Sequence, residues 1–180
     1  DECNDVLEYH AMYRNNHIGI GVGESLLDSE GNILYPHMIH TMKDGVKVGL
    51  VGIVTDYING WEKKENLVGI QVFEPFEAAK KALEDLQVKV DLTIGIYHGG
   101  VESDLETGKR LSETTENIGY KICTELGFDV LLTGHQHMPV AGRMVNGTYT
   151  LQPLANGREY AYVEIDLEKE AFSSGNATYP

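Results

Sequence analysis

The sequence contains few cysteines, few basic residues and no long apolar run, and each shortage excludes a class of protein. Its two cysteines, Cys3 and Cys123, allow at most one disulfide, which excludes a cysteine-stapled scaffold. No apolar stretch approaches the roughly 20 residues needed to cross a bilayer, so no membrane span is expected. Internal repeats and low-complexity tracts are absent as well. With 42% apolar and 23% charged residues over 180 positions, the sequence predicts one globular domain.

The shortage of basic residues also limits the partners. Fourteen Lys and Arg stand against 28 Asp and Glu, and the formal net charge is -14. Such a charge repels DNA, RNA and anionic membrane surfaces at long range, so polymeric nucleic acid is not an expected partner. A small phosphate ester stays possible, because bound divalent cations would reverse the local field. Most carboxylates, Asp104 and Glu106 among them, are assigned to solubility unless they orient a metal ligand.

Strands and helices alternate along the chain, which predicts an α/β fold with a mixed sheet and flanking helices. An Asp44-Gly45 turn joins two expected strands, and Pro75 begins a helix with one apolar face. A second helix is expected between Ser112 as its cap and Gly127 as its stop. Strands are expected at 35–42, 46–55, 91–97, 129–134, 140–145, 148–152 and 160–166, helices at 75–86 and 113–126, and a short helix at 7–13.

Three histidines follow the ends of two apolar runs. His98 closes the run from Leu92 to Tyr97, and His135 and His137 close the run from Val130 to Gly134. Ligands of open α/β sheets bind beyond the carboxyl ends of the strands, so the three imidazoles are expected at one rim. In extended backbone, residues two apart point the same way, which would place His135 and His137 on one side.

The surroundings of these histidines strengthen the prediction of a metal site. A lone histidine is more often a surface residue or a hydrogen-bonded core residue than a ligand. Here the glycines at 99, 100 and 134 are expected to let a ligand approach closely. Neutral imidazole binds ions such as Zn and Mn. His10, His17, His37 and His40 lack this context and are left out of the site.

Several other residues allow a functional and a structural interpretation. Tyr57 and Trp61 are candidates for substrate contact, but an aromatic side chain that covers the core edge is the favoured interpretation. Asn117 is expected to complete a helix cap. Exposed ion pairs are the expected role of three arginines, Arg110, Arg143 and Arg158.

The histidine motifs resemble those of the calcineurin-like metallophosphoesterases. The two segments are Tyr97-His98-Gly99-Gly100-Val101-Glu102-Ser103-Asp104-Leu105-Glu106-Thr107-Gly108 and Leu132-Thr133-Gly134-His135-Gln136-His137. The closer match is the bacterial 5'-nucleotidase, 2',3'-cyclic-nucleotide 2'-phosphodiesterase and UDP-sugar hydrolase branch. Matching pieces also occur at 45–52, 61–62, 66–67 and 152–157, and the similarity extends from about Leu27 to Asp166.

This resemblance implies part of a four-layer α/β/β/α sandwich with C-terminal antiparallel strands. Residues 1–167 would be the C-terminal portion of the catalytic domain, and residues 168–180 a linker or tail. Two divalent ions, Zn, Mn or similar, would be bridged by a carboxylate, with His98 and His135 on one ion and His137 on the other. The family's Asp-x-His, Gly-Asp and Gly-Asn-His motifs are not in the sequence, and Asp1 falls where the family has its catalytic histidine. We therefore expect a piece of a longer enzyme.

The implied activity is metal-dependent hydrolysis of phosphate esters of nucleotides, with a site that is incomplete in this chain and impaired when alone. A nuclease, a pyrophosphatase or a protein phosphatase remains open within the same enzyme class. The alternative class is a noncatalytic metal-binding or assembly module derived from the fold. The compartment, bacterial cytoplasm or cell surface, depends on the residues before Asp1, and nucleobase recognition is implied to belong to a separate C-terminal domain.

Self-association is the first testable expectation. A piece that lacks the N-terminal half of the sandwich would expose sheet surface and strand edges, which favours pairing between copies. Light scattering should give a mass above that of the 20.0 kDa chain. A clean monomer would contradict the expectation.

Overall fold

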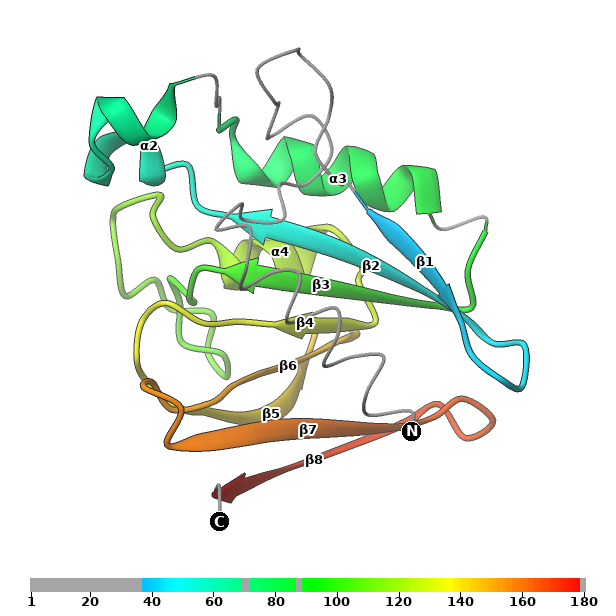
Figure 1. The fold of residues 1–180 in the computed structure, drawn as a ribbon. Helices are drawn as coiled ribbons and strands as arrows, with labels where there is room; N and C mark the ends of the chain where they lie inside the picture. Colours follow the sequence, from blue (N-terminus) through cyan, green and yellow to red (C-terminus); the bar gives the residue numbers. More distant parts are fainter. Residues whose placement is uncertain (1–36, 69–71, 87–88, 179–180) are drawn as a thin grey trace.

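The computed structural model describes residues 37–68, 72–86 and 89–178 and confirms the α/β class (Figure 1). Six strands form a mixed sheet in the order β1-β2-β3-β4-β6-β5, and two more form the antiparallel pair β7-β8. The strands are β1 (Met38–Thr41), β2 (Lys47–Val54), β3 (Leu92–His98), β4 (Val130–Leu132), β5 (Val140–Val145), β6 (Thr148–Gln152), β7 (Glu159–Asp166) and β8 (Ala171–Thr178). The helices are α2 (Ile58–Trp61), α3 (Pro75–Leu86) and α4 (Gly119–Glu125), with a 3₁₀ turn η1 (Lys64–Leu67).

The centre of the sheet is parallel, and its edges are antiparallel. Strands β2, β3, β4 and β6 run the same way, whereas β1 pairs antiparallel with β2 and β5 antiparallel with β6. The register pairs Val54 at the end of β2 with His98 at the end of β3, and Ile96 with Leu132 at the end of β4. The carboxyl ends of the central strands therefore meet at one rim.

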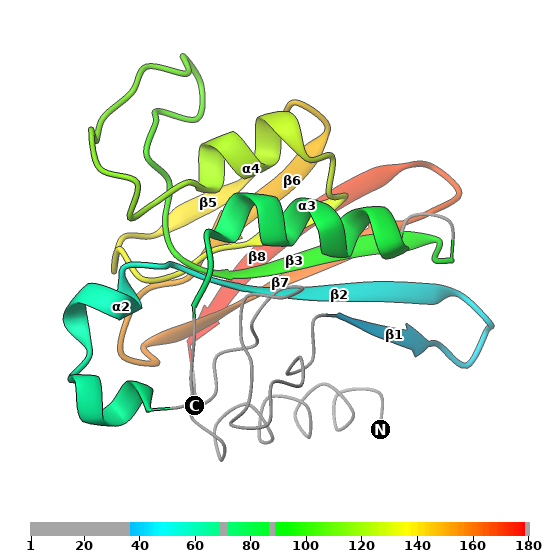
Figure 2. The same cartoon turned by 90° about the horizontal axis from the view of Figure 1, so that it is seen from above.

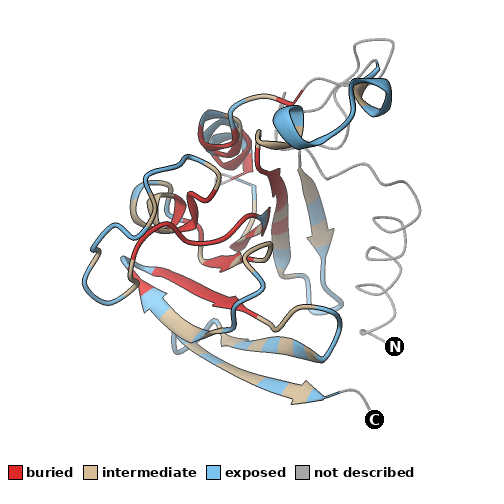
Figure 3. Ribbon diagram, turned by 90° about the vertical axis from the view of Figure 1, so that its left-hand side faces the viewer, coloured by how far each residue is buried: buried red, intermediate tan, exposed pale blue. Residues whose placement is uncertain are grey.

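Helices α3 and α4 lie side by side over one face of the sheet (Figure 2). The ammonium group of Lys121 on α4 lies 3.8 Å from the centre of the Phe76 ring on α3. Both helices and the strands beneath them belong to one hydrophobic core, which stands out as the buried region of Figure 3. Cys123 is part of this core and is not in a disulfide, and burial raises the pKa of its thiol to about 12. It serves as a small apolar residue of the core.

Most expected elements are present within a few residues of their predicted limits. The Asp44-Gly45 turn joins β1 to β2, with Gly45 at a φ of 95°. Gly127 ends α4 at a φ of 73°, a conformation that favours glycine. The helix expected at 7–13 lies outside the described residues, as do Asp1, Cys3, His10 and His17. In the part of the chain that is described, no helix is long and apolar enough to cross a membrane.

The expected helix at 113–126 begins too early, because its cap is a different residue. Residues 113–118 form a loop, and α4 starts only at Gly119. The carboxylate of Glu102 accepts hydrogen bonds from the backbone N–H groups of Tyr120 and Lys121 at 2.9 and 2.8 Å. A buried carboxylate from another loop thus replaces Ser112 at the positive end of the helix.

Residues 171–178 form a strand rather than the expected linker or tail. Strand β8 pairs with β7 over its full length, from Asp166 opposite Ala171 to Glu159 opposite Thr178. Phe172 stacks on Tyr149 with ring centres 5.5 Å apart, and the Tyr149 hydroxyl bonds to the Ser174 hydroxyl at 2.9 Å. Backbone pairing and one aromatic contact order a segment whose composition is that of a loop.

Replacing a leucine by alanine should lower the free energy of unfolding strongly only where the leucine is buried in the core. Leu131 on β4 is 0% exposed, whereas Leu111 is 68% exposed. We expect Leu131→Ala to lower the free energy of unfolding by about 2–5 kcal/mol, since it removes buried methyl groups and leaves a cavity. The matched control Leu111→Ala should change it by less than about 0.5 kcal/mol. Urea unfolding followed by circular dichroism measures both, and equal effects would contradict the placement of the core.

Candidate metal centre

His98 and His135 lie side by side at the rim where the parallel strands end. His98 is the last residue of β3, and His135 follows β4 in the loop that leads to β5. Their ring centres are 5.2 Å apart and the rings are inclined by 59°. The convergence predicted for these two imidazoles is therefore present. His137 is near enough for its charge to lower the pKa of His98.

The backbone of the loop after β4 is not extended, and the expectation that it would be is wrong. His135 and His137 have φ values of 70° and 57°, in the left-handed region that non-glycine residues seldom adopt. Gly134 donates its N–H to the carbonyl of Gly99 at 3.0 Å, and Gln136 donates its own back to Gly134 at 2.8 Å. A tight turn, rather than strand alternation, therefore presents both histidines.

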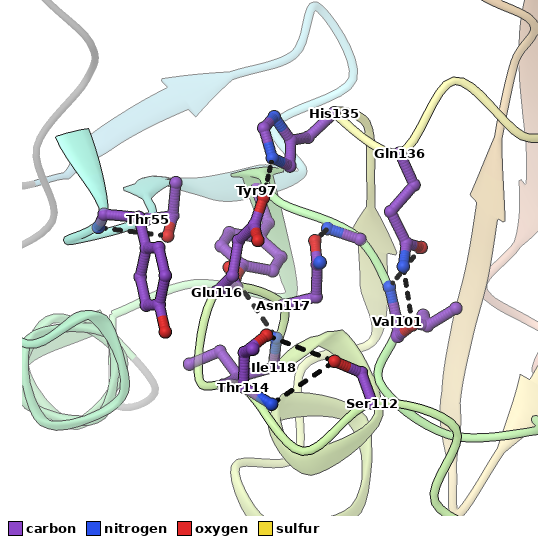
Figure 4. A network of polar contacts seen from close by, with 12 residues as sticks. Thr55, Tyr97, Val101, Ser112, Thr114, Glu116, Asn117, Ile118, His135 and Gln136 are labelled. Carbon is purple, nitrogen blue, oxygen red and sulfur yellow. Dashed lines mark hydrogen bonds and ion pairs between the residues drawn. The ribbon is translucent and has the colours of Figure 1, made fainter. Parts of the chain in front are cut away.

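The side chain of Gln136 ties this turn to the loop after β3 (Figure 4). Its amide oxygen accepts from the Val101 N–H at 2.8 Å, and its amide nitrogen donates to the Val101 carbonyl at 2.9 Å. Sequence reasoning assigned no role to this residue. The two bonds pair both polar backbone groups of Val101 and fix the turn in which His135 and His137 are left-handed.

The glycines after His98 make room for protein side chains and not, as expected, for a ligand. A Cβ on Gly99 would lie 2.0 Å from the Tyr97 ring, and one on Gly100 would lie 2.1 Å from the Gln136 amide. Real Cβ atoms do not approach other atoms this closely. Both positions thus require glycine because the neighbouring side chains fill the space.

A third loop, residues 113–118, brings a carboxylate to the site. Glu116 Oε1 lies 2.8 Å from Nε2 of His135. The Tyr97 hydroxyl donates to the Glu116 carbonyl at 3.3 Å and accepts from the Ile118 N–H at 3.2 Å. Asn117 Oδ1 accepts from the Gly100 N–H at 2.6 Å, so its amide joins two loops and does not cap a helix. No spacing or motif in the sequence marks these contacts in advance.

Trp61 covers His135 from the side of α2. The indole stacks on the imidazole with ring centres 5.0 Å apart and an inclination of 19°, and Tyr57 lies 6.0 Å from Trp61. Trp61 is 49% exposed, so it does not seal the core edge as the favoured interpretation held. It forms a wall of the site.

The electrostatics of the rim favour a neutral imidazole at His98. The atoms packed around this side chain lower its pKa through desolvation, and the charges of His135 and His137 lower it further. The neutral ring is the form that binds metals. Asp56 follows β2 at the same rim. Burial raises the pKa of the Asp56 carboxyl, a backbone hydrogen bond partly offsets this rise, and the charge of Glu74 adds to it. Asp56 Oδ1 is buried and has no hydrogen-bond partner within the described ranges.

The separation of the His98 and His135 rings can be compared with that of two imidazoles bound to one divalent ion. Ring nitrogens bind Zn at about 2.0–2.1 Å, which places the centres of two rings on one tetrahedral ion about 5 Å apart. The observed 5.2 Å agrees with this separation. No group of three or more His, Cys, Asp or Glu side chains is gathered to hold an ion in the part of the chain that the structure covers.

Other candidate residues lie in ordinary surface contacts. Asp104 accepts from Thr107 and closes a turn, and this hydrogen bond holds the pKa of its carboxyl below the usual value. Arg110 pairs with Glu113 at 3.9 Å, and Arg143 with Glu106 at 3.8 Å. These pairs are the exposed ion pairs that the sequence predicted.

Comparisons with known proteins point to phosphoesterases. No family model matches the chain. The trifunctional nucleotide phosphoesterase protein YfkN of Bacillus subtilis (strain 168) is 27% identical, in a match that covers 81% of this chain and 10% of that protein. The endonuclease YhcR of the same organism is also 27% identical, in a match that covers 70% of this chain and 10% of that protein.

Two solved structures of similar proteins align with this chain. The putative 5'-nucleotidase from Staphylococcus aureus in complex with alpha-ketoglutarate aligns with a TM-score of 0.73 at 28% identity, over 86% of this chain and 31% of that one. The calcineurin-like phosphoesterase YfkN from Bacillus subtilis shares the fold, with a TM-score of 0.64 at 21% identity over 87% of this chain and 54% of its own. The chain spans a tenth of the curated relatives, and its match covers about a third of the nucleotidase.

The tie made by Gln136 can be tested through Gly100. In Gly100→Ala the new methyl group would occupy the place of the Gln136 amide, which must leave Val101. We expect the loss of two hydrogen bonds to lower the free energy of unfolding by about 1–3 kcal/mol in urea titrations. Gly134→Ala is the matched control, because a Cβ there meets nothing within 4 Å. Equal stability of both variants would refute the role of the tie.

Proposed function

Because the chain resembles the calcineurin-like phosphoesterases of the 5'-nucleotidase branch, we propose that it contributes metal ligands to the hydrolysis of nucleotide phosphate esters. The single observation that carries the proposal is the approach of His98 and His135, which stand at the ends of neighbouring parallel strands with ring centres 5.2 Å apart. His98 ends β3 and His135 lies in the loop after β4, and the loops that follow these two strands are tied to each other.

The proposed roles follow the resemblance residue by residue. His98 and His135 would hold one divalent ion, and His137 would hold a second one. Ions held there would polarise the phosphoryl oxygens and lower the pKa of a bound water. Desolvation lowers the pKa of His98 and so favours its neutral, metal-binding form, while the tied loops and the Glu116 carboxylate hold the ring of His135 in place.

The proposed substrate is a small phosphate ester of a nucleotide. The net charge of -14 opposes a long polyanion, whereas an ion held by the histidines would supply local positive charge for one phosphate. Trp61 presents a half-exposed indole beside His135, where an aromatic ring or sugar face of a substrate can pack. The remaining ligands that the resemblance implies are not in the sequence, so we propose that the site of this chain is incomplete.

Metal binding by the chain tests the proposal directly. Isothermal titration with Zn or Mn should show at least one ion per chain in the unaltered protein. His98→Ala and His135→Ala should each weaken binding by at least about 10-fold, because each removes a donor to the same ion. His40→Ala on β1 is the matched control and should bind like the parent. Less than one ion per chain, or binding that survives both replacements, would contradict the proposed site.

Hydrolysis distinguishes an enzyme from a noncatalytic module. With added Mn, 5'-AMP, 2',3'-cyclic AMP and bis-p-nitrophenyl phosphate should be hydrolysed slowly, since the proposed site is incomplete. The rate should fall to background in His98→Ala and His135→Ala. Metal binding without any turnover would favour the metal-binding module, and turnover that persists in both variants would rule out these histidines as the source.

A further inference from the structure

Within the part of the chain that the structure describes, Glu116 makes the one side-chain hydrogen bond of His135. Neither the resemblance nor the sequence pattern gives Glu116 a role. Its Oε1 lies 2.8 Å from Nε2 of the imidazole (Figure 4). Both groups are partly shielded, since the side chain of His135 is 20% exposed and that of Glu116 is 31% exposed. A contact this short between shielded groups constrains the imidazole more than a solvated surface pair does.

The chemistry of the two groups determines where the imidazole proton lies. An ionised carboxylate can only accept hydrogen bonds, so Nε2 of His135 must be the donor. In the neutral ring, a proton on Nε2 leaves the lone pair on Nδ1. Nδ1 is then the nitrogen that is free to bind an ion.

The carboxylate is held on a rigid base. The carbonyl of Glu116 accepts from the Tyr97 hydroxyl, and the next two residues are bonded to Gly100 and again to Tyr97. Tyr97 is 2% exposed and belongs to β3, the strand that ends in His98. One strand therefore positions both His98 and the carboxylate that contacts His135.

Trp61 restrains the remaining freedom of the ring. The near-parallel stack, at 19° and 5.0 Å between ring centres, opposes tilting of the His135 imidazole out of its plane. The hydrogen bond that the His135 ring makes to Glu116 opposes rotation within that plane. Together the two contacts define one orientation of the ring.

We propose that Glu116 is a positioning residue, which fixes the Nε2–H tautomer of His135 and so selects Nδ1 as its metal-binding atom. This inference rests on the proposed function, in which His135 binds a divalent ion. Removal of a carboxylate that orients a metal-binding histidine in this way typically weakens metal binding by about 10–100-fold.

The tautomer can be measured without any metal. Long-range ¹H–¹⁵N correlation spectra of the metal-free chain at about pH 8, above the ordinary histidine pKa, should show His135 with its proton on Nε2. Glu116→Ala should give a mixture of both tautomers, whereas Glu116→Gln should keep the Nε2–H form, because its amide oxygen still accepts the bond. The backbone contacts of Glu116 do not involve its side chain, so both variants retain the ties that order the loop.

Metal titration supplies the second readout. Glu116→Ala should weaken Zn or Mn binding by about 10–100-fold, and Glu116→Gln should recover part of that loss. Glu113→Ala, on the same loop with a side chain 94% exposed, is the matched control and should match the parent in both measurements. An unchanged tautomer and unchanged affinity in Glu116→Ala, in a chain that binds metal through His135, would overturn this inference alone. A parent protein that binds no metal would instead overturn the proposed function.

Discussion

The hydrogen bonds between the loop after β3 and the loop after β4 are the constraint on which the whole rim depends. Left-handed backbone at His135 and His137 costs of order 1–3 kcal/mol for each residue. The Gln136 amide bonded to both polar groups of Val101, and the Gly134 N–H bonded to Gly99, offset that cost. Without these contacts nothing in the local sequence would hold His135 in the turn that brings it beside His98.

The parallel sheet brings the candidate site residues to one rim, and the loops set the orientation of their side chains. The register of β2, β3 and β4 brings three strand ends to one rim, but it does not set the orientation of any ring. Orientation comes from groups that reach across between loops. Tyr97 anchors the 113–118 loop, Glu116 contacts His135, and Trp61 stacks on the same imidazole from α2.

The sequence was sufficient to predict the sheet, the helix at 75–86 and the meeting of His98 with His135, because apolar runs, turn dipeptides and strand direction are local signals. It was insufficient wherever the structure depends on a contact that no local pattern marks. The start of α4 depends on Glu102, which no capping pattern near Ser112 reveals. Similarly, the reason for glycine at Gly100 is the Gln136 amide, and the order of residues 171–178 comes from pairing with β7.

Glu102 also has a consequence for the length of the loop that it closes. Its carboxylate binds the first turn of α4, while its carbonyl accepts from Leu111 and Ser112 at 2.8 and 3.1 Å. Residues 103–110, in which Ser103 pairs with Arg110, therefore form a loop whose two ends are held together by the buried Glu102. Extra residues or a fluorescent reporter inserted near Thr107 would lengthen this loop, and the entropy cost of closing a loop grows only slowly with its length. The hydrogen bonds that Glu102 makes to Ser112 and α4 would stay in place.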